Sequence, residues 1–267
     1  MTDNLPQKPK AFITDLNDFD KNEKSLHMSV SAKNIDRLKE LSIENLWLVG
    51  ANEKELRKIL PLVDVKYLNL YQVLAKDLTI LETLNKTETI ILNWNTKSTA
   101  LWDISKNKGL KTLEITDFSK LEEIDQLSLA KQIRDLTLGG GHDKPLKIKS
   151  INALKWLTNL RKLSLTNLKI ADDTLQPLGH LKHLEVLNLS NQFETKEYAW
   201  LATRLTNTNC KMFKATNSCN IVGADNKTVW DTMVTGRKKS FLLSTKDQAK
   251  IDKHIKDFEK LKTELTE

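Results

Sequence analysis

The stretch LRKLSLTNLKIADDTLQPLGHLKHLEVLNL, residues 160–189, carries the pattern that decides the fold. Leu163 and Leu165 alternate with polar residues, and Leu187 begins the same alternation 24 residues later. Alternation with a period of two predicts a short strand with one buried face. In residues 175–181 an apolar side chain recurs every third position, which predicts a helix or helical turn, with Asp172 or Asp173 as its N-cap. The stretch therefore predicts a strand followed by a helical return.

The same apolar-x-x-apolar-x-apolar pattern recurs at intervals of 22 to 27 residues. Of the 44 leucines, 38 fall between Leu26 and Leu205, inside the repeated region. The middle apolar residues of the copies are Leu41, Leu68, Ile90, Leu113, Leu136, Leu163, Leu187 and Phe213, with the copies at Ile90 and Phe213 weaker. A single strand of this length cannot bury its face alone, but strands stacked in parallel complete one another's core and backbone bonding. We therefore predict an α/β solenoid of about eight repeats with a parallel β-sheet.

These copies resemble the leucine-rich-repeat superfamily over roughly residues 35–218, and residues 160–189 are similar to its bacterial-type repeats. The resemblance implies a right-handed, horseshoe-shaped solenoid that binds proteins through the exposed, concave face of its sheet. Many members carry Asn five residues after each middle anchor. Here those positions hold Leu46, Val73, Asn95, Phe118, Gly141, Leu168, Gln192 and Ser218, so we expect irregular turns.

A solenoid needs a cap at each end, because its outermost apolar rungs have no neighbour. We predict an N-terminal arm and cap in residues 1–34, repeats in 35–219, and a C-terminal cap in 220–267. Residues 228–234 and 239–243 predict a hairpin around Gly236. A helix is expected from about Lys246, opened by Ser244 or Thr245. Its apolar face would hold Ile251, Ile255, Phe258, Leu261 and Leu265.

No segment of the sequence predicts a catalytic, metal or cofactor site, a signal peptide or a membrane span. The glycines at 139–141 lack the following residues of a phosphate loop, so we interpret them as a turn. His180 and His183 lack two further ligands for a metal. Cys210 and Cys219 fit free thiols in a reducing cytoplasm. The sequence therefore favours a cytoplasmic protein that is not an enzyme.

Two surfaces are candidates for binding a partner. If the anchors point inward, Tyr67, Tyr71 and Ile91 lie together on the exposed sheet face, with Trp94 at a strand end. Glu40 and Glu44 would lie beside them. Tyrosine is typical of binding hot spots, although these residues could equally be ordinary strand residues.

The alternative surface is the basic C-terminal end. The formal net charge is +7, and residues 237–256 hold seven basic and two acidic residues. Arg237, Lys238 and Lys239 form its densest group, and such a group favours electrostatic docking to nucleic acid or an acidic surface. Nucleic acid is the weaker choice, because no aromatic residues are interleaved with the charges. We predict a protein partner.

Overall fold

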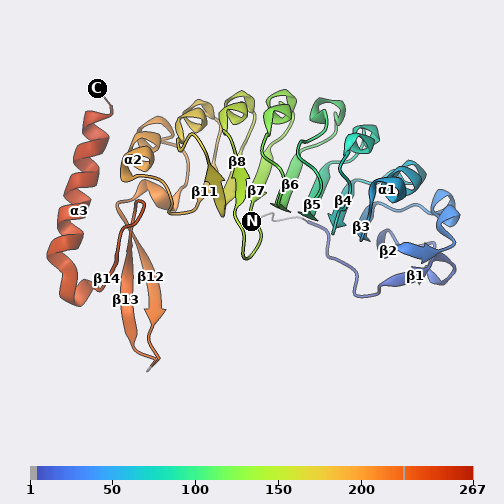
Figure 1. Ribbon diagram of the computed structural model, residues 1–267, viewed down its shortest axis with the longest axis horizontal. Helices are drawn as coiled ribbons and strands as arrows, with labels where there is room; N and C mark the ends of the chain where they lie inside the picture. Colours follow the sequence, from blue (N-terminus) through green and yellow to red (C-terminus); the bar gives the residue numbers. More distant parts are fainter. Residues whose placement is uncertain (1–4, 225, 267) are drawn as a thin grey trace.

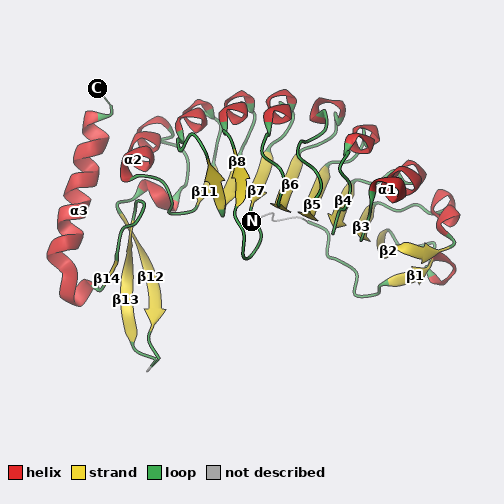
Figure 2. Ribbon diagram, viewed as in Figure 1, coloured by secondary structure: helices red, strands yellow, loops and turns green. Residues whose placement is uncertain are grey.

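The computed structural model describes residues 5–224 and 226–266. These residues form an arched solenoid in which strands line the inner side and helical segments follow the outer side (Figures 1 and 2). The main sheet has nine strands, all parallel to their neighbours, and its two outermost strands are the shortest. In spatial order they are β1 (Ile13–Asp15), β2 (Ser25–Lys33), β3 (Asn45–Val49), β4 (Tyr67–Tyr71), β5 (Thr89–Asn95), β6 (Thr112–Phe118), β7 (Asp135–Gly139), β9 (Lys162–Thr166) and β11 (Val186–Leu189). A separate pair, β8 (Leu146–Ile148) and β10 (Leu168–Ile170), is also parallel.

Short 3-10 turns and two α-helices return the chain along the outer side. The helices there are α1 (Glu53–Ile59) and α2 (Thr195–Arg204). The turns are Leu16–Asp18, Ile35–Glu40, Leu60–Leu62, Thr79–Thr83, Ile104–Lys106, Asp125–Leu129, Asn152–Trp156, Gln176–His180 and Lys211–Phe213. α1 begins with a capping box, in which Asn52 and Glu55 each accept a hydrogen bond from the other's backbone N–H. The turn Gln176–His180 has no such cap, so the prediction of Asp172 or Asp173 as N-cap is wrong.

The predicted register is confirmed for the six middle copies. Leu68, Ile90, Leu113, Leu136, Leu163 and Leu187 lie opposite one another on adjacent strands and are at most 2% exposed. The helical return predicted at 175–181 is a 3-10 turn. One apolar cluster runs through all the repeats, as the stacking of incomplete cores requires.

The prediction is wrong for the first and last copies, because Leu41 and Phe213 do not lie in strands of the main sheet. Leu41 follows a 3-10 turn, and the strand beyond it is β3, whose inward residues are Leu46 and Leu48. The segment Ile43-x-x-Leu46-x-Leu48 fits the same pattern and is the one that the sheet uses, since it places Leu46 opposite Leu68. Phe213 ends a 3-10 turn and lies in no strand of the main sheet.

Three strands between residues 216 and 242 form an antiparallel sheet that projects from the end of the solenoid (Figure 1). Its strands are β12 (Thr216–Val222), β13 (Thr228–Val234) and β14 (Phe241–Leu242). The predicted pairing around Gly236 is present, but the second strand is shorter and β12 adds a third strand. The N-cap of helix α3 (Ser244–Glu264) is Leu243, whose side chain cannot accept a hydrogen bond, and the Ser244 hydroxyl donates to Asp231. Phe258 of α3 is fully buried in the repeat core.

Most strands lead into a turn that requires a left-handed residue. Four positions after the inward anchor of five strands, the backbone φ lies between 49° and 79°. These residues are Gly50, Gln72, Trp94, Asp117 and Asn167. Glycine, Asn and Asp tolerate this conformation, whereas a bulky aromatic residue is strained there. Trp94 is therefore the outlier of the series.

Candidate functional site

The inner face of the sheet carries a small apolar cluster made of Trp47, Tyr67 and Ile91, which we call the concave cluster. These side chains point away from the main core, because their strand neighbours point into it. The rings of Trp47 and Tyr67 lie 4.8 Å apart. Asn69 donates a hydrogen bond of 3.2 Å to the Tyr67 hydroxyl, and burial raises the pKa of that hydroxyl.

The concave cluster is buried, contrary to the expectation that Tyr67 and Ile91 are exposed. All three residues are at most 7% exposed, although they lie on the inner surface of an open arch. Leu5 packs against them. Figure 1 shows the blue N-terminal segment crossing the hollow beneath β3 and β4 before it enters β1. We call residues 5–12 the arm.

The arm is held by side chains. The Phe12 ring lies 4.7 Å from the His27 ring, and Pro9 and Lys10 line a cavity of about 340 Å³ together with His27. Among the residues that the structure describes, no backbone–backbone hydrogen bond joins the arm to the sheet. Burying a leucine fully contributes about 1.5–3 kcal/mol, whereas ordering one residue costs about 1–2 kcal/mol. The arm is therefore weakly held.

A second aromatic pair beside the concave cluster is open to solvent. Tyr71 is 46% exposed and Trp94 is 37% exposed, and their ring centroids lie 5.8 Å apart. Tyr71 ends β4, and Trp94 lies in the left-handed position near the end of β5. Aromatic rings that are fixed by a rigid sheet and still exposed can contribute apolar area at little entropic cost.

The acidic residues of the candidate site are not where the sequence predicts them. Glu40 ends a 3-10 turn, and Glu44 precedes β3 and pairs with Lys66 at 2.8 Å. That ion pair lowers the pKa of the Glu44 carboxyl, first through the hydrogen bond from Lys66. Glu114 lies opposite Ile91 on the next strand and is the carboxyl nearest in register to the concave cluster. Burial raises the pKa of Glu114.

Sequence reasoning missed Trp47 and His27, which lie opposite each other on β3 and β2. A first strand centred on Leu41 does not reach Trp47, and so it does not bring Trp47 next to His27. A step of 22 residues back from Leu68 gives Leu46, which matches the steps of 22 and 23 that follow and places Trp47 on the face. The spacing therefore held the missing signal.

The three basic candidates at the C-terminal end differ in their contacts: Arg237 is paired with carboxylates, whereas Lys238 and Lys239 are exposed. Arg237 pairs with Asp173 and Glu194, and its Nε donates a hydrogen bond of 2.8 Å to the Gln192 carbonyl. These contacts join the C-terminal sheet to the last repeats, so the charge of Arg237 is already compensated. Lys238 and Lys239 remain exposed.

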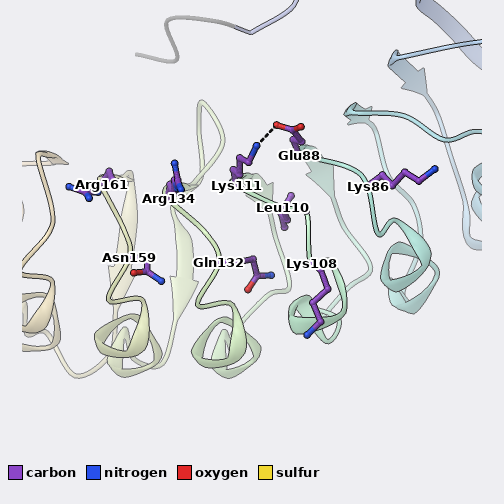
Figure 3. Close-up of a pocket in the computed structure, with 10 residues that line it drawn as sticks. Lys86, Glu88, Lys108, Leu110, Lys111, Gln132, Arg134, Asn159 and Arg161 are labelled. Atoms are coloured by element: carbon purple, nitrogen blue, oxygen red, sulfur yellow. Dashed lines mark hydrogen bonds and ion pairs between the residues drawn. The ribbon is translucent and has the colours of Figure 1, made fainter.

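A basic groove of about 560 Å³ lies where the chain enters β5, β6, β7 and β9. Figure 3 shows its charged residues side by side on successive repeats. They are Lys86, Glu88, Lys108, Lys111, Arg134 and Arg161. Lys111 pairs with Glu88 at 2.6 Å and Arg161 with Glu185 at 2.9 Å. Arg134 lies between Lys111 and Arg161 in the groove, and no carboxylate among the described residues forms an ion pair with it.

The described part of the chain contains no group of three or more metal-ligating side chains. Within the same residues, no helix combines the length and apolar character needed to cross a membrane. Cys210 and Cys219 are both free thiols, and burial raises the pKa of Cys210 to about 11.

No model of a protein family matches the chain, and no curated protein sequence matches it either. Several solved structures are similar to part of it, among them the following three. The Listeria monocytogenes internalin InlF is 18% identical over 71% of this chain and 61% of its own, with a TM-score of 0.44. Internalin C2 of the same species is 20% identical over 67% and 64%, with a TM-score of 0.41. A leucine-rich-repeat protein of Leptospira interrogans is 20% identical over 70% and 54%, with a TM-score of 0.47.

The chain thus spans less than two thirds of each of these proteins. Its own architecture, a stack of parallel Leu-x-Leu strands with helical returns, defines a repeat solenoid of the α/β class. The repeat length and the buried leucine ladder make this the leucine-rich-repeat fold.

Proposed function

We propose that this protein is a non-catalytic, protein-binding scaffold that contacts its partner through the concave face around β4 and β5. The observation that carries the proposal is the exposed Tyr71–Trp94 pair next to the concave cluster. Rings of this kind, fixed beside a buried apolar centre, have the composition of interface hot spots.

The backbone at Trp94 supports the same conclusion. A tryptophan in the left-handed region costs folding free energy, and the other four strands of the series place Gly, Gln, Asp or Asn at this position. Strain of this kind is found where a side chain is needed for its contacts. The exposed ring of Trp94 contacts Tyr71 within the chain, so its remaining surface is available to a partner.

The experiment replaces Tyr71 with a photoreactive phenylalanine and cross-links the partner in the native host. The partner recovered is then titrated against Tyr71→Ser, Trp94→Asn and against Lys238→Ala, Lys239→Ala. We expect the aromatic variant to lose about 2 kcal/mol or more of binding free energy and the lysine variant far less. A larger loss in the lysine variant, together with a steep salt dependence, would place the partner at the C-terminal end.

A second candidate is electrostatic docking of an acidic protein segment in the basic groove. Arg134, which has no acidic partner among the described residues, favours this surface over the C-terminal end, where Arg237 is neutralised. If the groove is the binding surface, Arg134→Glu should weaken binding more than Lys238→Glu at low salt. Equal affinities of the two variants would exclude the groove.

A further inference from the structure

The arm, residues 5–12, lies on the concave face of the sheet, where the proposed function places the partner. It therefore occupies this face as a bound peptide segment would. Leu5 contributes the only side chain of the arm that packs in the concave cluster among the described residues. Without it, Trp47, Tyr67 and Ile91 would form an open apolar patch on the inner face of the sheet. The structure therefore already contains one occupant of that patch.

The chemistry of this occupant is specific. Its sequence, LPQKPKAF, has prolines at positions 6 and 9. Leu5, Pro6 and Pro9 are partly buried, whereas Gln7, Lys8 and Lys10 are exposed. A repeat of three residues, with prolines facing inward, is typical of an extended polyproline-type segment. Such segments dock on aromatic surfaces at low entropic cost, because proline fixes the backbone in advance.

The way in which the arm is held makes it displaceable. It pairs with no strand, and its prolines at 6 and 9 remove two of the backbone donors with which it could do so. Its remaining ring contact, between Phe12 and His27, lies at the far end near β1, and Phe12 is 46% exposed. Leu5, two partly buried prolines and the contacts of Pro9 and Phe12 with His27 hold the arm, and another segment of the same kind can replace contacts of this small number.

We infer that the concave cluster is a docking site for an extended, proline-containing segment anchored by a leucine, and that the arm of this chain occupies the site until a partner segment displaces it. The inference rests on the proposed function, since it names the kind of partner that binds this face. Tyr71 and Trp94 then contact the partner beside the docked segment.

The test uses the full chain labelled with 5-fluorotryptophan, with the ¹⁹F resonance of Trp47 assigned by Trp47→Phe. Leu5→Asp should release the arm and shift this resonance. Gln7→Asp is the matched control, because it introduces the same charge at an exposed position of the same arm. It should leave the resonance unchanged.

The peptide LPQKPKAF is then added to each protein. It should return the Trp47 resonance of Leu5→Asp toward its original position, and it should bind this variant at least about tenfold more tightly than the unaltered chain, in which the tethered arm competes. The peptide carrying Asp for its leucine should not bind. Replacement of both prolines by alanine should weaken binding several-fold.

Three results would overturn the inference. The first is a Trp47 resonance that does not move in Leu5→Asp, and the second is one that moves but is not restored by millimolar peptide. The third is a concentration-dependent dimer that Leu5→Asp dissolves, since the arm would then belong to a neighbouring copy. None of these results affects cross-linking at position 71, so the failure of the arm's role is distinguishable from failure of the proposed function.

Discussion

At the scale of single residues, the left-handed position near the end of five of the strands distinguishes residues that suit the backbone from one that does not. Gly50, Asp117 and Asn167 suit that backbone, and their side chains are those that sterics favour there. Trp94 does not suit it. Its ring gains a contact with Tyr71 in return, but such a contact contributes only about 0.5–1.5 kcal/mol.

We expect Trp94→Asn to fold at least as stably as the original chain. Relief of left-handed strain, about 1–2 kcal/mol, offsets the lost ring contact, so the free energy of unfolding should stay equal or rise by up to about 1 kcal/mol. Urea denaturation measures the change. A loss above about 1 kcal/mol would show that the ring of Trp94 is needed for the fold.

Cys210 should be chemically inert in the folded protein. Its pKa of about 11, raised by burial, lowers its thiolate population near pH 8 about a hundredfold relative to a thiol of pKa 9.0. Iodoacetamide labelling read by mass spectrometry should therefore modify the partly exposed Cys219 first. In urea the two cysteines should react at similar rates. Faster native labelling of Cys210 would contradict its position in the core.

At the scale of structural elements, the turns show how this chain replaces the Asn ladder. Five residues after the anchors, Val73, Phe118 and Leu168 fill the space with apolar side chains that are at most 3% exposed. Asn95 is the one asparagine at these positions, and its side chain makes hydrogen bonds to the backbone of the turn. Its Nδ2 donates to the Ala75 carbonyl, and its Oδ1 accepts from the backbone N–H groups of Lys97 and Ser98. The expected departure from a uniform ladder follows from these substitutions.

The helix α3 offers a matched pair of residues on one element. Phe258 is fully buried against the repeats, whereas Ile255, three residues earlier, is 40% exposed. Phe258→Ala should cost about 3–5 kcal/mol of unfolding free energy, and Ile255→Ala should cost under about 0.5 kcal/mol. Both are measured by chemical denaturation. Equal, small losses would mean that α3 does not cover the last repeats in solution, and its role as a cap would be wrong.

At the scale of the whole molecule, the repeats should unfold together, because each core is completed by its neighbours. Leu136 and Leu163 lie opposite each other in the middle of the sheet. Leu136→Ala or Leu163→Ala should each cost about 2–5 kcal/mol and shift one common transition seen by circular dichroism and by tryptophan fluorescence. Two separate transitions would show that the two halves of the arch fold independently.

The repeat pattern could be predicted from the sequence because a period of two residues inside a period of about 23 leaves little freedom of register. Two features of the structure could not be predicted from the sequence: the register of the first strand and the burial of the concave cluster. Leu41 and Leu46 both satisfy the apolar pattern, and the choice depends on pairing with β4. The burial of Tyr67 and Ile91 depends on Leu5, a contact across more than sixty residues that no local pattern encodes.

The short strands at the two edges of the sheet have a consequence for the protein in a crowded cell. An open sheet edge can template another chain and grow into a fibre. Here β1 has three residues with an interrupted register, and β11 has four, followed by a single bridge to Asn209. Neither edge offers a long row of aligned donors and acceptors, so stacking of one arch on the next is disfavoured. The short edge strands β1 and β11 thus work against end-to-end growth of the nine-stranded sheet into a fibre.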